Sequence, residues 1–210
     1  MPPEILSALT CDDITGLILA GGRGSRMGGQ DKGLMQLHGL PQAQWLAQQL
    51  RLQTAGVLIS ANRHINIYQR FGFPVIQDDD DSFAGPLAGI LAALRHCPTS
   101  LLLVTPCDTP AVHPELALML LRHLQQDDRP LAYIQTISTT GESRDHPGFA
   151  LIHRDLSGQL KAYLASGQRR VLQWFREQKA SVCVVPDHIS FHNLNTPEAV
   201  SAYQSEAGSR

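Results

Sequence analysis

Short apolar runs alternate with amphipathic segments between Ile14 and Gln126, and this alternation most constrains the fold. Four runs are typical of buried strands, at residues 14–20, 56–61, 73–77 and 100–105. Helix-like segments separate or follow them, at residues 41–54, 65–71, 86–96 and 113–125. Because short loops between such elements favour βαβ crossovers, the pattern indicates a mostly parallel sheet with helices on both faces. We predict a three-layer α/β/α Rossmann-like fold.

The second half of the chain is less regular. Strand patterns at residues 131–137 and 146–152 flank a polar turn, which favours a locally antiparallel addition to the sheet. One more strand and three more helices are predicted, the strand at residues 181–185 and the helices at 155–165, 169–178 and 197–204. No repeat or linker interrupts the pattern, so we predict one domain over residues 14–204. Residues 1–13 are interpreted as a loose N-terminal extension and residues 205–210 as a tail.

Composition limits the partners and the compartment. The formal net charge of −2 over 210 residues gives no broad attraction to nucleic acid or to membranes. The N-terminus lacks the pattern of a secretory signal, and the four cysteines show no metal-ligand spacing. We therefore expect a cytoplasmic protein with reduced thiols and with neither a nucleic-acid nor a membrane partner.

A glycine-rich segment, LILAGGRGSRMGGQDK, begins within the first apolar run, at Leu17, and ends at Lys32. It is not a P-loop, because Lys32 follows an aspartate and no Ser or Thr comes next. It does not match the dinucleotide-binding pattern either, since Met27 stands at the third glycine position. Glycines let backbone N–H groups approach a polyanion, and Arg23, Arg26 and Lys32 add positive charge. We interpret the segment as a triphosphate-binding loop, the alternative being a flexible surface loop.

Polar residues also follow the other predicted strands. Asp108 comes after the most apolar run, within TPCDTP, where one carboxylate suits Mg²⁺ that is otherwise held by phosphate oxygens. The alternative for Asp108 is a helix cap. Because ligands of open α/β sheets bind at the carboxyl ends of the strands, we expect these loops to meet at one site.

Residues 17–41 resemble the signature of the nucleotidyltransferases of the nucleotide-diphospho-sugar transferase fold. Further stretches resemble, in the same order, one family among them, the molybdenum cofactor guanylyltransferases: SANRH, VIQDD, GPLAGI, TPCDTP, RDHPGFAL, GQRRV and HNLNTPEA. The resemblance covers nearly the whole chain. It implies transfer of GMP from GTP to the phosphate of molybdopterin, with release of pyrophosphate and formation of the guanine dinucleotide cofactor.

The resemblance also implies roles for particular residues. Lys32, Arg26 and Asp108 would be catalytic, and Asp108 would also bind Mg²⁺. Nucleotide-binding residues would be Leu19, Ala20, Gly21, Gly22, Gly24, Lys32, Ser60, Asp78, Gly85 and Asp108. Residues on the molybdopterin side would be Asp145, His146, Arg169, Arg170 and Asn193. Residues 14–126 would then form the nucleotide-binding part and residues 127–204 the molybdopterin-side part.

One of these positions departs from the family. Ser60 stands where the family commonly has Asn, so either the backbone makes this contact or guanine recognition is distributed differently. Asn62 and Arg63 match the family, and we assign them only to loop structure.

Three alternative functions stay open. They are a cytidylyltransferase acting on the same cofactor, a sugar-1-phosphate nucleotidyltransferase, and a non-catalytic nucleotide-sensing module. The preferred function also admits transient contact with proteins that carry molybdopterin or mature molybdoenzymes.

Overall fold

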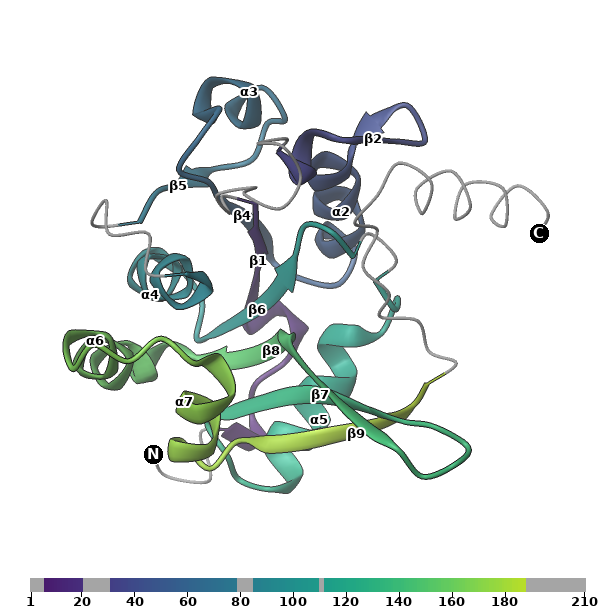
Figure 1. Ribbon diagram of the computed structural model, residues 1–210, viewed down its shortest axis with the longest axis vertical. Helices are drawn as coiled ribbons and strands as arrows, with labels where there is room; N and C mark the ends of the chain where they lie inside the picture. Colours follow the sequence, from purple (N-terminus) through teal and green to yellow (C-terminus); the bar gives the residue numbers. More distant parts are fainter. Residues whose placement is uncertain (1–5, 21–30, 79–84, 110–111, 188–210) are drawn as a thin grey trace.

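A seven-stranded sheet forms the centre of the molecule, in the order β5-β4-β1-β6-β8-β7-β9 (Figure 1). The computed structural model describes residues 6–20, 31–78, 85–109 and 112–187. The strands of this sheet are β1 (Ile14–Leu19), β4 (Gly56–Ser60), β5 (Val75–Ile76), β6 (Leu101–Pro106), β7 (Leu131–Ile137), β8 (Ser143–His153) and β9 (Ser181–Pro186). Parallel pairs join β1 to β4 and β6, β4 to β5, and β7 to β9. The predicted mostly parallel α/β sheet is therefore confirmed.

The antiparallel addition is also confirmed. Strand β8 runs antiparallel to β6 on one side and to β7 on the other. A bulge after Tyr133 shifts the β7–β8 register, so that Ala150 pairs with Tyr133 while His146 pairs with Ile134. Strand β8 pairs with β6 only over residues 150–153, and its outer half, which pairs with β7 alone, begins with the polar residues Ser143, Arg144, Asp145 and His146.

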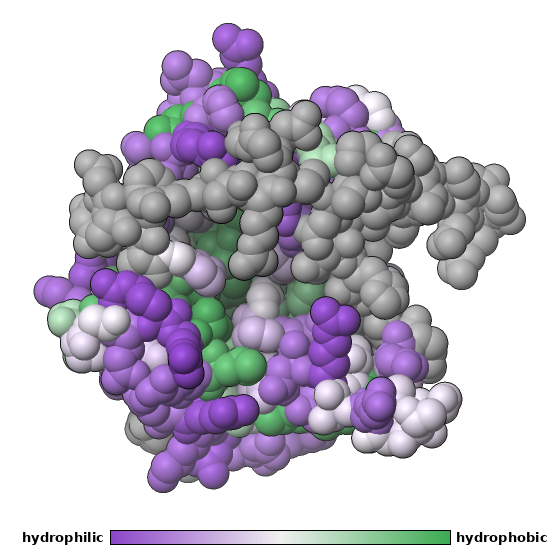
Figure 2. Space-filling model, in the orientation of Figure 1, coloured by the Kyte–Doolittle hydropathy of each residue, from purple (hydrophilic) through white to green (hydrophobic). Residues whose placement is uncertain are grey.

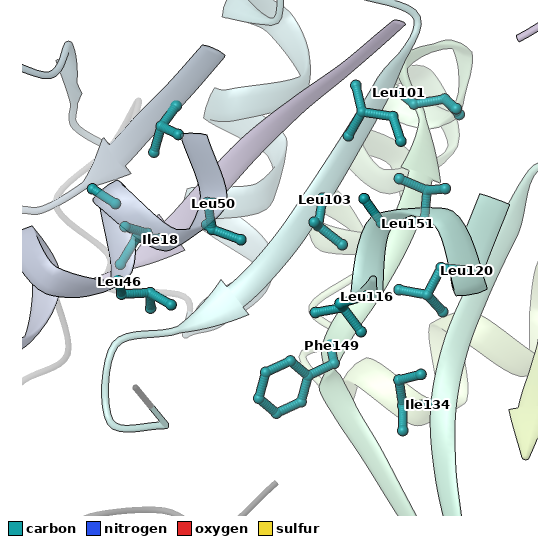
Figure 3. Close-up of a cluster of buried hydrophobic side chains, with 14 of the residues drawn as sticks. Ile18, Leu46, Leu50, Leu101, Leu103, Leu116, Leu120, Ile134, Phe149 and Leu151 are labelled. Atoms are coloured by element: carbon teal, nitrogen blue, oxygen red, sulfur yellow. The ribbon is translucent and has the colours of Figure 1, made fainter. Parts of the chain in front are cut away.

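Helices cover both faces of the sheet (Figure 1). On one face α2 (Gln42–Arg51) and α5 (Leu116–Gln126) pack against Ile18, Leu103, Ile134 and Leu151, as Figure 3 shows. On the other face α4 (Pro86–His96), α6 (Ser157–Ala165) and α7 (Val171–Glu177) pack against Leu17, Leu102 and Ile152. The two cores exist because alternate residues of a strand point to opposite faces. This is the predicted three-layer arrangement.

Several boundaries differ from the expected ones. The helix expected at residues 41–54 ends at Arg51, which leaves Leu52 82% exposed instead of in the core. Trp45 of this helix is only half-buried, and its ring lies tilted against that of His38 with 4.9 Å between the centroids, whereas Trp174 is fully buried. A small hairpin of β2 (Gln36–Leu37) and β3 (Leu40–Pro41) was not predicted, because two-residue strands show no periodicity. A further helix, α3 (Ile65–Gln69), lies between β4 and β5.

The segment before β1 was interpreted as a loose extension, and for residues 6–13 this is wrong. Leu6 is buried against the core, and the Gln125 side chain donates hydrogen bonds to the carbonyls of Leu6 and Leu9. Thr10 and Asp13 then form a capping box around the 3-10 helix η1 (Cys11–Asp13). The bonds from Gln125 span 119 and 116 positions of the sequence, so the composition of the segment could not indicate them.

Two observations bear on the expected environment. Within the described part of the chain, no helix is both long enough and apolar enough to cross a membrane. All four cysteines are free thiols, and three of them are buried.

Candidate nucleotide site at the carboxyl edge of the sheet

Three neighbouring loops begin together where the parallel strands end. The amide of Cys107 donates to the carbonyl of Leu19, 3.2 Å away, and the amide of Ala20 donates to the carbonyl of Ser60, 2.9 Å away. In a third bond, the amide of Ala61 donates to the carbonyl of Ile76 in the neighbouring strand β5. The expected nucleotide-binding residues Leu19, Ala20, Ser60, Asp78 and Asp108 therefore lie along one edge of the sheet, as predicted for an open α/β fold.

Lys32 and Asp108 contact each other directly. The Nζ of Lys32 lies 3.0 Å from Oδ2 of Asp108, and the two side chains are 30% and 16% exposed. Lys32 begins the short 3-10 helix η2 (Lys32–Leu34), whereas Asp108 follows β6. A cation and a carboxylate from two different loops thus meet in a partly desolvated position, where both can reach a ligand above the edge.

Asp78 is held by a residue that we had assigned only to loop structure. The Nδ2 of Asn62 donates to Asp78 Oδ2 at 2.8 Å, and the Asp78 amide donates back to Asn62 Oδ1 at 2.9 Å. The paired bonds join the loop after β4 to the end of β5. Asn62 therefore orients a candidate nucleotide-binding carboxylate, a role that only its place in the SANRH stretch could have suggested.

The start of α4 closes one side of this edge. Gly85 has φ 76° and ψ −163°, a backbone conformation that favours glycine, and Pro86 begins the helix. One turn later, Gly89 lies so close to β4 that a Cβ atom there would be 2.6 Å from Ser60 Oγ. Ser60 is buried in this contact, so its hydroxyl faces α4.

The residues expected on the molybdopterin side do not form one group. Asp145 accepts hydrogen bonds from Tyr133 Oη and Gln135 Nε2, on the sheet face that α7 covers. His146 lies beside it but on the opposite face, with Nε2 2.9 Å from Thr136 Oγ1. Arg169 and Arg170 are exposed between α6 and α7, and Arg169 donates to the carbonyls of Leu164 and Gln168.

Several predicted residues lie outside the described part of the chain. They are Gly21, Gly22, Gly24, Arg26 and Asn193, together with the helix predicted at residues 197–204. Figure 2 shows the face of the molecule that includes the described part of this edge, with hydrophobic residues visible in a recess between hydrophilic ones.

Cys107, which lies at this edge, is poorly suited to covalent catalysis. Burial, followed by the neighbouring carboxylates of Asp108 and Asp31, raises the pKa of the Cys107 thiol well above its usual range. Cys107 therefore stays protonated and is a poor nucleophile. Among the described residues no three His, Cys, Asp or Glu side chains form a metal-binding group. Asp108 offers a single carboxylate, and Mg²⁺ bound with nucleotides usually takes one or two carboxylates together with phosphate oxygens.

The mostly parallel sheet, with a lysine–aspartate pair at its carboxyl edge, defines an open α/β protein with a candidate nucleotide site. Solved structures share this fold. A molybdopterin-guanine dinucleotide biosynthesis protein A from Archaeoglobus fulgidus has a TM-score of 0.70 and 22% identity, with 93% of this chain and 100% of that one covered. A CMP:2-keto-3-deoxy-manno-octonic acid synthetase complexed with CTP has a TM-score of 0.72 at 15% identity, covering 93% and 98%.

The chain belongs to the MobA-like NTP transferase family, whose domain matches residues 16–182. A molybdenum cofactor guanylyltransferase from Cupriavidus metallidurans is 42% identical over 195 residues, which are 93% of this chain and 96% of that protein. The family resemblance found in the sequence is confirmed by these matches.

Proposed function

We propose that this protein transfers GMP from GTP to the phosphate of molybdopterin, releasing pyrophosphate and forming molybdopterin guanine dinucleotide. Membership of the MobA-like family and the guanylyltransferase name of a 42% identical relative support the reaction class. The observation that carries the proposal is the 3.0 Å contact between Lys32 and Asp108 at the carboxyl edge. It brings together the two kinds of charge that nucleotidyl transfer needs, one for phosphate oxygens and one for a metal.

The reaction requires little acid–base chemistry from the protein. The attacking group is a phosphate monoester, whose second pKa is about 6, so it is largely ionised near neutral pH. The chain therefore has to align this phosphate with the α-phosphorus of GTP and neutralise the growing negative charge. We assign the charge on the α-phosphate to Lys32 and, from the sequence resemblance, to Arg26 as well.

The protein's residues fit a requirement for Mg²⁺. Asp108 offers a partly exposed carboxylate with one oxygen paired to a cation, at the strand end where the phosphates are expected. We propose that this carboxylate holds the ion, which when bound would supply further charge neutralisation. We assign Asp78, oriented by Asn62, to the guanine base or the ribose hydroxyls.

The assignments on the acceptor side remain proposals. Asp145 and His146 lie on opposite faces of the sheet, so we propose that they act on different parts of the molybdopterin site. We also propose Arg169 and Arg170 as contacts for the molybdopterin phosphate. The free thiols support a reducing compartment, and we propose a cytoplasmic location.

Incubation of the purified chain with GTP, MgCl2 and molybdopterin tests the proposal. We expect pyrophosphate release together with a guanine dinucleotide product, measured by a coupled assay and by chromatography. Omission of Mg²⁺ should abolish both signals. The test variant Lys32→Ala should lose turnover. Its matched control is Lys161→Ala, which removes an exposed lysine of α6 and should retain turnover.

The alternative functions give different results in the same assay. A faster reaction with CTP would indicate the cytidylyltransferase, and transfer to a sugar 1-phosphate would indicate a sugar nucleotidyltransferase. Tight GTP binding without Mg²⁺-dependent pyrophosphate release would indicate a sensing module. Any of these three results would contradict the proposed reaction.

A further inference from the structure

Asp31, directly before Lys32, is a buried carboxylate at the centre of a hydrogen-bond network. Its side chain is only 4% exposed. Oδ1 accepts from Tyr68 Oη at 2.6 Å and from the Gly33 amide at 3.2 Å, while Oδ2 lies 3.0 Å from Nδ1 of His64. Both oxygens therefore have partners from the protein itself, which is how a buried carboxylate becomes tolerable.

The network fixes the backbone position from which the Lys32 side chain extends. Asp31 is the N-cap of η2, and its side chain accepts the amide of Gly33 inside that turn. Lys32 is the first residue of the turn, so the backbone geometry of Lys32 depends on the capping bond. From this backbone the lysine side chain extends to Asp108.

The partners of Asp31 come from a separate part of the fold. Tyr68 belongs to α3, is fully buried and packs edge-on against Phe71, with 5.5 Å between ring centroids. His64 precedes α3 with a left-handed φ of 53°, and its side chain is 45% exposed. Burial, followed by its bond to Asp31, raises the pKa of Tyr68, so the phenol stays a hydrogen-bond donor. The segment containing Lys32 is thereby fixed to the loop and helix after β4.

Gly33 shows how tightly this network is built. A Cβ atom at residue 33 would overlap the Tyr68 hydroxyl, so only glycine leaves room for the bond between Tyr68 and Asp31. In the sequence Asp31-Lys32-Gly33, the aspartate caps the turn, the lysine is the cation, and the glycine leaves space for the Tyr68 hydroxyl that bonds to the aspartate. Both oxygens of Asp31 already have partners from the protein, so we assign this carboxylate to positioning its neighbour.

We propose that Asp31, His64 and Tyr68 form a positioning triad that holds the Lys32 ammonium beside Asp108 and so sets the rate of nucleotidyl transfer. The kinetic part of this inference rests on the proposed function, whereas the positional part does not. The triad acts through Lys32 alone, and its loss should change turnover more than GTP affinity.

Chemical labelling of Lys32 tests the positional part without any substrate. The chain has only three lysines, and the exposed Lys161 and Lys179 serve as internal references. Acetic anhydride labelling of the full chain is followed by peptide mass spectrometry, for wild type, Asp31→Asn and Tyr68→Phe. Because the ion pair with Asp108 shields the amine, we expect its loss to raise the Lys32-to-Lys161 labelling ratio about threefold or more. The matched control is Thr15→Val, which removes the 2.7 Å hydrogen bond between the Thr99 hydroxyl and Thr15, a buried residue at the start of β1, far from Lys32 along the strand direction.

Steady-state kinetics test the catalytic part. Tyr68→Phe should lower kcat about tenfold with KM for GTP nearly unchanged, since a displaced catalytic group reduces rate more than binding. In a Lys32→Ala background, Asp31→Asn should lower kcat no further, whereas an independent structural role would give additive losses. Tyr68→Phe retains the packed ring, so it remains informative if Asp31→Asn does not fold.

Three results would overturn the positioning triad: wild-type labelling ratios in both variants, a rise in the ratio for Thr15→Val of the same size, or additive losses with Lys32→Ala. If the wild type shows no GMP transfer, the proposed function fails, while the labelling ratio still decides whether the triad positions Lys32.

Discussion

At the scale of single residues, the site depends on short contacts between side chains that are distant in sequence. Lys32 meets Asp108 across 76 positions, and Asn62 holds Asp78 across 16. Each pair joins the loops that follow different strands. The Lys32 ammonium pairs with a single oxygen of Asp108, and this one-point contact suits a compact ammonium better than the planar, two-point guanidinium of an arginine.

We predict that Lys32→Ala lowers kcat about 10²- to 10³-fold, as expected when one donor to the transition-state charge is removed. KM for GTP should change only a few-fold, because most of the triphosphate contacts are expected from the glycine-rich loop. Steady-state rates of pyrophosphate release measure both constants, with Lys179→Ala as the matched surface control. A large rise in KM with unchanged kcat would instead assign Lys32 to ground-state binding.

At the scale of elements, α4 approaches the sheet closely because of one glycine. Gly89 faces Ser60 and Leu19 at the ends of β4 and β1, and any side chain there would push the helix away from the site. Gly158 in α6 also lies within a helix, but a Cβ atom there would meet nothing within 4 Å. Alanine substitution at these two positions therefore distinguishes the cost of a steric clash from the gain in helix propensity.

We predict opposite effects on stability for alanine at these two positions. Gly89→Ala should lower the free energy of unfolding by about 1–3 kcal/mol, because its Cβ overlaps the Ser60 hydroxyl. Gly158→Ala should raise it by about 0.5–1 kcal/mol through helix propensity and a less flexible unfolded chain. Urea unfolding measures both values. If alanine stabilises the protein at both positions, the close approach of α4 at Gly89 is wrong.

At the scale of the whole molecule, the sheet separates a polar carboxyl edge from a packed amino edge. At the amino edge His153 ends β8 opposite Leu101, and its amide donates to the Pro130 carbonyl. The imidazole is buried, and its Nδ1 accepts the Asp155 amide at 3.3 Å. Burial lowers the pKa of His153, although the Asp155 carboxylate partly opposes this effect.

The lowered pKa predicts a loss of stability in acid. Below the unfolded-state pKa of about 6.5, the unfolded chain binds a proton at His153 that the folded chain does not bind. The free energy of unfolding should therefore fall with decreasing pH from about 6.5, by at most about 1.4 kcal/mol per pH unit, until the folded-state pKa is reached. His153→Asn keeps an acceptor for the Asp155 amide and should remove this component.

Urea unfolding at pH 8, 6.5 and 5 measures the difference between wild type and His153→Asn. The control is His96→Asn, which changes an exposed histidine and should keep the wild-type slope. An equal slope in wild type and His153→Asn would contradict the assignment to His153. Transfer activity at pH 8 should be the same in wild type and His153→Asn, because residue 153 lies at the edge opposite to the nucleotide site.

Sequence periodicity was sufficient for the order and type of most elements. The alternation of apolar runs and amphipathic segments placed β1, β4, β6 and α4 almost to the residue, since burial on a strand or helix follows a local repeat. The exceptions were Leu52, residues 6–13 and the β2–β3 hairpin, whose outcomes depend on helix termination and on distant packing. The order of the motifs along the chain was likewise sufficient to identify the family.

The sequence by itself therefore determined the fold class, the family and the residue types that follow each strand. Only the tertiary structure decided which of those residues meet: Lys32 with Asp108, Asn62 with Asp78, and the buried Asp31 with Tyr68. It also separated Asp145 from His146, which are adjacent in sequence but lie on opposite faces of β8. The physical reason is that secondary structure follows from local steric and hydrophobic repeats, whereas side-chain contacts depend on how βαβ crossovers bring distant strand ends to the same edge.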